Sequence, residues 1–547
     1  MKKNITRNLI IFACFYIANL TTVFAQTTVT VDEGLNTLSD ALTANPGATL
    51  VLARGGSYVL DHTTSITAAT QIECADTPAN LPPAVISIYG DFGTINNGND
   101  LLQTSANVTF KNIGFIGWTY DGLQQCGTMV KITSPNVSLV FDGCVVQGAF
   151  KVVETNGNNG LSLLFKNCTL FNLSCHSNFD NLGGFFTMWG NDAAFKVVNC
   201  TFFECGRIMN CGGLSQISSE IMDHNTYVNI YGDLYYPSMS KTFIASNNIY
   251  YNSNMRGYVG PRTASGYVGD FNGDFAGDSL EGDAAILETN EISRNIQVKS
   301  NLRYYDQRVI DNQLSAQMAT LQPLLNDSVR RTFANHSDWV LKDNILFEEG
   351  NKVDPQFQMG ALPAEAYTNA FLETVQRRLP PEQQTAGYPF SIVWYPINPT
   401  TTVNYTPGEF IWPLPFNLKP TNASLPLGSD GFPLGDLNWY GKAEVQQWES
   451  TNTGVQSILQ NNEFELKASP NPFNNSISIS YSVPTNARVT LKLYNVIGKE
   501  MMSVLNQVES QGNHQVSIDA SNIQSGVYFC KIQIGNSVAV QKIMKSN

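Results

Sequence analysis

The chain has 547 residues, of which 43% are hydrophobic and 14% are charged. An average soluble protein carries about 25% charged residues. The hydrophobic fraction is enough for a buried core and excludes a chain that is disordered along its whole length. The formal net charge is −13, and no block is rich in Lys and Arg. Because nucleic-acid binding depends on clustered cations, we expect no nucleic-acid partner.

Residues 1–25 have the features of a secretory signal peptide. Basic residues lie within residues 1–7, an apolar run covers residues 9–18, and Val23-Phe24-Ala25 provides a small-residue cleavage site. The apolar run is too short to span a membrane, and no stretch after residue 25 is long enough to do so. We therefore expect an exported chain that begins at Gln26 and keeps no transmembrane segment.

Short strand-like runs with a polar turn in the middle recur between residues 108 and 254. They cover residues 108–115, 137–146, 161–170, 194–202, 221–227 and 243–250. Aligning the turns gives spacings of 31, 24, 32, 25 and 23 residues between Asn112, Gly143, Asn167, Asn199, His224 and Asn247. Variable spacing around a fixed unit predicts a coil with loops of different length on one side. Residues 301–304 and 344–347 extend the pattern towards residue 350.

The two columns that follow the turn are apolar or contain cysteine. The first holds Ile113, Cys144, Cys168 and Cys200, and the column two residues further on holds Phe115, Val146, Leu170 and Phe202. Because strand side chains alternate, both columns face the interior, and the three thiols would stack at about the 4.7–4.9 Å spacing of neighbouring strands. We expect reduced thiols that behave as small hydrophobes. Disulfides or a functional role are the alternatives.

These ladders resemble a known fold. The turn asparagines and inward aliphatic residues in the stretches FKN, VVNCTF, DHNTY and SNNIYYN are similar to those of the right-handed parallel β-helix of the pectate-lyase superfamily, the pectin-lyase-like fold. The opening also fits, because a short helix with Leu35, Leu38, Ala41 and Leu42 on one face precedes strands at 49–52 and 55–60 and resembles the terminal cap of such coils. The resemblance covers residues 28–350 and implies a fold, not a reaction.

We place the β-helix domain at residues 26–441, with insertions from about residue 305. Residues 312–333 and 362–379 have helical spacing. Residues 388–440 are rich in Pro and aromatics, including 394–396 (WYP), 411–413 (IWP) and 435–439 (GDLNW). This segment would either lie extended against the coil or present a sugar-stacking surface. Residues 442–463 are polar and are predicted to be a linker.

Residues 464–547 form a separate small antiparallel β-sandwich. Strands are expected at 476–483, 488–495, 515–519, 526–534 and 537–544. The landmarks 470–473 (PNPF), 493–499 (LYNVIGK), 525–529 (SGVYF) and 542–545 (KIMK) resemble the type A C-terminal sorting domain of the Bacteroidetes type IX secretion system. The resemblance implies that the type IX machinery is a partner and that the protein is secreted or attached to the outer-membrane surface. A generic β-sandwich binding module is the alternative.

The long side of a β-helix suits an extended polymer, so an extracellular polysaccharide is the expected ligand. Lyases on this scaffold need a Lys or Arg base and a cation, Ca²⁺ or another Arg, beside the uronate carboxylate. Lys196 and Arg207 are the main catalytic candidates, and the remaining cations near the repeats are Lys166, Arg256 and Arg262. No motif joins them. The clustered aspartates of polygalacturonases are not found as a set, and the isolated candidates are Asp192, Glu204, Asp223 and His224.

One acidic stretch matches part of a calcium loop. Five possible ligands fall at positions 1, 3, 5, 9 and 12 of an EF-hand, and they are Asp270, Asn272, Asp274, Asp278 and Glu281. Position 6 should be Gly but is Phe275, so an acidic solvated loop is the alternative. Ca²⁺ is the one cofactor that the sequence suggests.

Two function classes remain. The first is an enzyme on an acidic polysaccharide, with a lyase as the leading reaction, and the second is a non-catalytic glycan-binding or adhesion protein. Lys or Arg facing bound acids or Ca²⁺ in a groove would favour the first class, and exposed aromatic rings would favour the second.

Overall fold

The structure is a computed structural model. Apart from a few single residues and short turns, it describes residues 27–89, 100–119, 125–173, 184–188, 193–211, 217–230, 240–253, 294–307, 339–358, 410–451 and 466–546. The helices expected at 312–333 and 362–379 lie almost entirely outside these residues.

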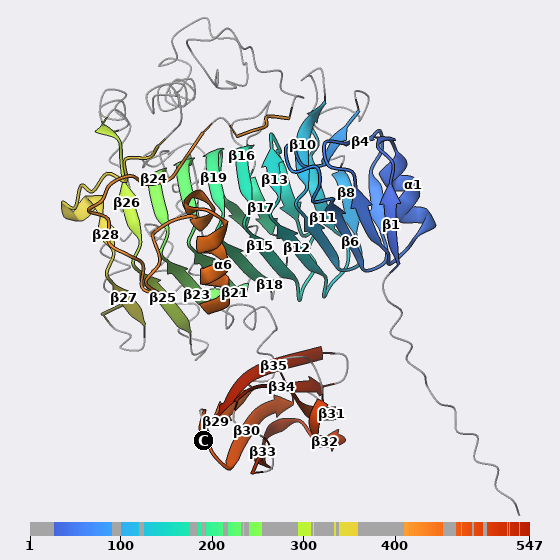
Figure 1. The fold of residues 1–547 in the computed structure, drawn as a ribbon, viewed down its shortest axis with the longest axis vertical. Coiled ribbons are helices and arrows are strands. Elements are labelled where there is room, and N and C mark those ends of the chain that lie inside the picture. The colour runs from blue at the N-terminus through green and yellow to red at the C-terminus, as the bar shows by residue number, and fades with distance from the viewer. Residues whose placement is uncertain are drawn as a thin grey trace, which may run out of the picture.

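Three parallel sheets, called A, B and C, form a long coil (Figure 1). Sheet A contains β1 Thr28–Val31, β3 Thr49–Leu52, β6 Thr70–Cys74, β9 Val108–Lys111, β12 Ser138–Asp142, β15 Ser162–Lys166, β18 Ala193–Val198, β21 Ile217–Asp223, β23 Ser240–Ser246, β25 Asn295–Lys299 and β27 Val340–Lys342. Sheet B contains β2 Gly34–Leu35, β4 Ser57–Leu60, β7 Val85–Ile88, β10 Gly114–Thr119, β13 Val145–Gln147, β16 Thr169–Leu173, β19 Thr201–Cys205, β22 Thr226–Ile230, β24 Ile249–Ser253, β26 Leu302–Tyr304 and β28 Ile345–Leu346.

Sheet C contains β5 Thr64–Ile66, β8 Asp100–Thr104, β11 Thr128–Ile132, β14 Lys151–Glu154, β17 Gly184–Met188 and β20 Met209–Cys211. Along the chain, a strand of A is followed by a strand of B and, over much of the coil, by a strand of C. Each strand pairs in parallel with its counterpart in the next turn of the coil. This is a parallel β-helix, so the predicted fold class is confirmed.

One residue in the left-handed backbone region joins most strands of sheet A to sheet B. Asn112, Asn167, Asn199, His224 and Asn247 have φ angles between 51° and 59°. Asn tolerates this conformation better than most residues because its short polar side chain can bond locally. The predicted turn column is therefore confirmed, and the register of His224 is fixed by the pairing of Asp223 with Val198 and Ser246.

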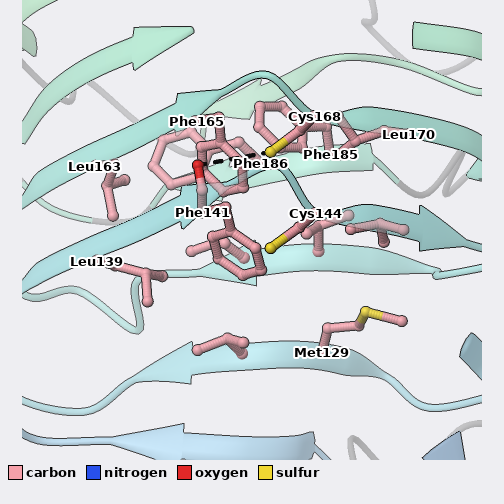
Figure 2. Packing of buried hydrophobic residues seen from close by; sticks show 14 of the residues in the cluster. Met129, Leu139, Phe141, Cys144, Leu163, Phe165, Cys168, Leu170, Phe185 and Phe186 are labelled. Carbon is pink, nitrogen blue, oxygen red and sulfur yellow. Dashed lines mark hydrogen bonds between the residues drawn. The ribbon is translucent and has the colours of Figure 1, made fainter. Parts of the chain in front are cut away.

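The predicted thiol column is also confirmed. Cys144, Cys168 and Cys200 are buried and unpaired, and the backbone N–H of Cys168 points at the sulfur of Cys200 at 3.4 Å. Figure 2 shows Cys144 and Cys168 in successive turns beside Phe141 and Phe165, whose rings stack at 4.5 Å. Thiols here fill space in an apolar core, and burial raises the pKa of Cys144 and Cys168 well above the ordinary value.

Beyond Cys200 the same column changes to asparagine. Asn225, Asn248 and Asn301 each donate an amide N–H to the asparagine of the next turn, at 3.1, 3.0 and 3.0 Å, and the last acceptor is Asn344. The hydrogen-bonded asparagine ladder therefore lies one residue after the turn column, in the position that the cysteines occupy earlier. This is a correction to the sequence analysis, which placed the ladder in the turn.

The N-terminal cap is the helix α1 Thr37–Ala44, with Leu38 and Leu42 buried against the first turn. Leu35 was expected on the same apolar face. It lies on β2 instead and is exposed. The helix begins two residues later than that face requires, because Asn36 takes the left-handed conformation at its N-terminus.

Residues 410–451, called the strap, run along the outside of the coil. The ring of Phe416 packs on Phe171 and Phe203 of sheet B, with centroid distances of 5.6 and 4.6 Å. The strap continues through η3 Leu437–Tyr440 and α6 Lys442–Thr451. The described part of the Pro/aromatic segment thus lies against the coil, as the first of its two interpretations predicts, whereas residues 394–396 lie outside the described residues.

The helix α6 occupies the first ten residues of the predicted linker. Val445 and Trp448 are buried together with Val198 of sheet A. Val445 and Trp448 are the only large apolar residues of α6, so the composition of this helix resembles that of a linker. Contact with the coil orders the helix. An earlier short helix, η2 Phe347–Glu349, follows the last strands of the coil.

The C-terminal residues form a small antiparallel sandwich with its own core. One sheet contains β29 Lys467–Ser469, β30 Ser476–Val483 and β33 Gly512–Asp519, and the other contains β31 Ala487–Asn495, β32 Glu500–Glu509, β34 Gly526–Ile534 and β35 Ser537–Lys545. Ile479, Leu491 and Ile532 are among its buried residues. The predicted sandwich is confirmed, although β29 and β32 were not foreseen. Within the described part of the chain, no helix is long and apolar enough to cross a membrane.

Candidate binding site on sheet C

Among the described residues, the strap covers sheets A and B. The N–H of Ile411 donates to Gln147 of β13 at 3.1 Å, and Phe410 lies against Gly114 of β10. Further along the strap, Leu434 packs on Ile249 and Leu302 of sheet B. No described contact of the strap falls on sheet C. We therefore looked for a functional surface on the outer face of sheet C.

In strands of sheet C, two successive residues belong to the core. In β14, Val152 and Val153 both belong to the core, so Lys151 and Glu154 on either side both face outward. Strands β8 and β11 show the same polar–apolar–apolar–polar order. The pairing then places Lys131 beside Gln103 and Glu154 on the outer face.

These outward residues form ion pairs and hydrogen bonds with one another. Lys151 Nζ lies 3.2 Å from Glu154 Oε2, and Lys131 Nζ lies 3.6 Å from Asp100 Oδ2. Thr128 donates to Glu154 at 2.9 Å, and Gln103 donates to Asp100 at 2.8 Å. The two lysine side chains are 23% and 19% exposed, so a ligand would meet cations that are held in place but still accessible.

The cations keep Glu154 ionised. Burial alone raises the pKa of this carboxyl, but Lys151, the Thr128 hydroxyl and Lys131 outweigh burial and lower the pKa below its ordinary value. The ionised Glu154 lies 3.2 Å from Lys151 Nζ and holds this cation in place on the outer face. Lys151 is therefore positioned to bind an anion.

Arg207 lies beside the same residues but is itself buried, with 6% of it exposed. Gly184 of β17 pairs with Lys151, and a Cβ atom built on Gly184 would lie 2.9 Å from Arg207 Cγ. The absence of a side chain at Gly184 thus leaves room for Arg207 next to Lys151. We call this group the sheet C site, and its members are Asp100, Gln103, Thr128, Lys131, Lys151, Glu154 and Arg207. It has three cations and two carboxylates, in a chain whose net charge is −13.

The other catalytic candidate, Lys196, is not part of this site. It lies on β18 of sheet A and is 2% exposed. Burial lowers its pKa to about 8, and Asp223 only partly offsets this effect. Its neighbour in register, Leu164, packs on the cluster that the strap forms with Val198.

The remaining sequence candidates have structural contacts or lie outside the described residues. Lys166 pairs with Asp142 at 2.9 Å, Glu204 accepts from Asn229 at 2.7 Å, and His224 lies 2.9 Å from Asp430 of the strap. Asp223 accepts from the hydroxyl of Ser246. The candidates Asp192, Arg256, Arg262, Asp270, Asn272, Asp274, Asp278 and Glu281 fall outside the residues that the structure describes.

Sequence reasoning missed Lys131, Lys151 and Glu154. A signal was present, because DLLQ at 100–103, TMVK at 128–131, KVVE at 151–154 and GFFT at 184–187 share two apolar residues followed by a polar one. Loops of variable length separate these segments from the strand–turn–strand units, so an alignment on the turn does not bring them into register.

Comparison with known proteins identifies the C-terminal part. Residues 467–546 match the family described as secretion system C-terminal sorting domain. This part of the chain is therefore a sorting domain, and the protein is exported and either secreted or attached to the cell surface. No curated protein sequence matches the chain.

A solved structure, "Structure of PL6 family alginate lyase AlyGC", is similar to part of the chain at 13% identity and a TM-score of 0.26. The match covers 42% of this chain and 36% of that chain. The chain thus corresponds to about a third of that protein. The assignment of the coil as a β-helix rests on its own strand pairing.

Proposed function

We propose that the protein binds an acidic polysaccharide across the outer face of sheet C after export by its sorting domain. The observation that supports this proposal is the pair of half-buried lysines, Lys131 and Lys151, beside the buried Arg207 on a face that the described strap leaves uncovered. Charged groups held by partners bind with less loss of side-chain entropy than free surface lysines.

The chemistry of the site suits uronate units. The two lysines can donate charge-assisted hydrogen bonds to sugar carboxylates. Gln103 and Glu154, which are partly exposed, offer partners for hydroxyl groups. Neighbouring turns repeat about every 4.7–4.9 Å, so successive cations follow an extended chain that runs across the strands.

A polysaccharide lyase is the second candidate, favoured by the two lysines at the site. One lysine would neutralise the uronate carboxylate, and the other would then have to lose its proton to act as the base. The described residues contain no cluster of three or more ligating side chains for a metal ion.

Affinity electrophoresis of the mature chain tests binding. We expect retardation by polygalacturonate or alginate, no retardation by neutral dextran, and weaker binding as salt is raised. Lys151→Gln and Lys131→Gln should each weaken binding about tenfold, because each removes a charge-assisted contact. Lys111→Gln, an exposed lysine on sheet A, is the matched control. Equal weakening by the control, or no retardation by any polyuronate, would refute the proposal.

The same polymers distinguish the two candidates. A lyase would produce the ultraviolet absorbance of unsaturated uronate, with or without added Ca²⁺, and a binding protein would not. Binding that persists without this absorbance assigns the non-catalytic function.

A further inference from the structure

At the capped end of the coil, a serine, a histidine and an aspartate are linked in that order. Ser39 Oγ lies 3.2 Å from His62 Nε2, and His62 Nδ1 lies 2.6 Å from Asp61 Oδ1. Serine hydrolases on unrelated folds use this sequence of contacts, in which the imidazole takes the serine proton and the carboxylate orients the imidazole. None of these residues belongs to the sheet C site.

A fourth residue holds the aspartate in position. Asn36 Nδ2 donates to Asp61 Oδ1 at 2.9 Å, and the N–H of Asp61 donates to Asn36 Oδ1 at 3.2 Å. Bonds to His62 and then Asn36 lower the pKa of Asp61. The ionised carboxylate favours the proton on Nδ1 of His62 and leaves Nε2 free to accept the serine proton.

The helix places Ser39 beside backbone donors. Ser39 lies in the first turn of α1, where backbone N–H groups have no partner within the helix. Asn36, at the N-cap, makes no side-chain cap hydrogen bond because its amide binds Asp61 instead. Buried Leu38 and Leu42 fix the helix on the coil. The N–H groups of the first turn would serve as the oxyanion donors of such a site.

We propose that Ser39, His62 and Asp61 form an esterase site that removes small acyl groups, such as acetyl, from sugar hydroxyls. The histidine and aspartate side chains are 53% and 42% exposed, so no enclosing wall selects a large acyl chain. An open site of this kind suits a small acyl group carried on a polymer that lies along the surface.

The position of the triad connects it with sheet C. Thr63, next to His62, donates to the backbone carbonyl of Asp100 at 2.6 Å, and β5 is the first strand of sheet C. Three strand spacings, about 14 Å, separate β5 from β14. A chain bound at Lys151 could therefore extend to Ser39. The choice of a polysaccharide rests on the proposed function, whereas the ester chemistry does not.

The reaction balances without a co-reactant other than water. Ser39 Oγ attacks the acyl carbon while its proton passes to His62 Nε2. The bond between the acyl carbon and the sugar oxygen then breaks, and His62 returns the proton to that oxygen. Water attacks the acyl-serine in the same way, gives its proton to His62, and releases the acid as Ser39 regains its hydroxyl.

A fluorophosphonate probe on the full mature chain tests the nucleophile. We expect covalent labelling at Ser39, located by peptide mass spectrometry, together with hydrolysis of p-nitrophenyl acetate. His62→Gln should slow both at least about tenfold, and Ser39→Ala should abolish the label at that peptide. Thr30→Ala, which removes an exposed hydroxyl from strand β1, should change neither rate. No label at Ser39, or a labelling rate that is unchanged in His62→Gln, would overturn the esterase site.

Acetylated and deacetylated polygalacturonate test the substrate class. Release of acetate from the acetylated polymer, lost in Ser39→Ala, supports the polysaccharide substrate. Cleavage of p-nitrophenyl acetate without any release from the polymer overturns that substrate while the esterase chemistry stands. The retardation assay of the preceding subsection reports separately whether sheet C binds the polymer.

Discussion

The two halves of the coil fill one interior column with different chemistry. In three turns the column holds Cys144, Cys168 and Cys200, and in the next four it holds asparagines from Asn225 to Asn344. Both kinds of residue contact a backbone carbonyl of the preceding turn. The thiol of Cys144 lies 3.5 Å from the carbonyl of Phe110, and the amide of Asn225 donates to the equivalent carbonyl of Val197 at 2.9 Å.

The difference lies in what else each side chain does. An asparagine also donates to the next asparagine and accepts from a backbone N–H, as Asn248 does with Asn301 and Asn225. A thiol makes only weak hydrogen bonds and contributes mainly as an apolar group. The cysteine half is therefore held by packing, including the stacked rings of Phe141 and Phe165. The asparagine half is held by a continuous polar network that must be fully satisfied.

The largest effect is expected from breaking the network in its middle. Asn248→Ala removes the acceptor for the N–H and amide of Asn225 and the donor to the carbonyl of Met222. Buried polar groups left without partners cost about 1–3 kcal/mol each, so the free energy of unfolding should fall by about 4 kcal/mol. Urea unfolding followed by circular dichroism measures this change.

Two matched variants make the comparison. Cys168→Ala should cost only about 1 kcal/mol, because it removes a small apolar group and strands no strong donor or acceptor. Asn295→Ala, on the exposed side of β25, should have little effect. Equal losses for Asn248→Ala and Cys168→Ala would contradict the distinction between the two halves.

A smaller effect should distinguish the two ends of the cysteine column. In Cys200→Asn the new amide would lie next to Asn225, whose oxygen already accepts from the N–H of residue 200 at 3.0 Å. This variant should stay within about 1 kcal/mol of the wild type. In Cys144→Asn the amide would face the sulfur of Cys168, and we expect a loss of about 2 kcal/mol. Urea unfolding of the two variants tests this prediction. A larger loss of stability in Cys200→Asn than in Cys144→Asn would refute the idea that the network can be extended only from its end.

The comparison also explains what the sequence could predict. One left-handed residue joins most strands of sheet A to sheet B, so Asn112, Asn167 and Asn199 keep a constant offset and reveal the coil. Sheet C follows loops of variable length, which hid Lys151 and Glu154. The ladder of asparagines was predicted one residue too early. Asn247 in the turn and Asn248 in the ladder are both asparagine, and only their hydrogen bonds show which of them belongs to the ladder.

Tertiary contact accounts for the other differences. Strand β32 exposes Met501 and Val508, which blurs the alternation that reveals a strand. The helix α6 depends on the contact of Trp448 with the coil, and the same cover buries Lys196, which looked like a surface cation in the sequence. Arg207 was the one foreseen member of the sheet C site, but its partners could not be foreseen, because they come from other turns.

The smallest effect concerns the strap where it crosses the boundary between the two halves. Asp436 accepts from Thr201 at 2.7 Å, in the turn of Cys200, and its N–H donates to Thr226 at 2.9 Å, in the turn of Asn225. Burial raises the pKa of Asp436 from 3.8 to about 7, although hydrogen bonds from Thr201 and Asn438 lower it in part. The docked strap therefore binds this proton more tightly than the free strap does.

Docking should weaken as pH rises from about 4 to about 7, because the docked carboxyl loses its proton at a higher pH than the free one. Hydrogen exchange at the amides of Asp436 and Asn438, corrected for intrinsic rates, should show at least about a tenfold loss of protection. Asp436→Asn should remove most of this dependence. The remainder belongs to His224: burial lowers its pKa, but Asp223 and Asp430 raise it overall, so its contribution to docking is also lost as pH rises. An unchanged pH dependence in Asp436→Asn would assign it to another titrating group, such as His224, and would refute the role of Asp436.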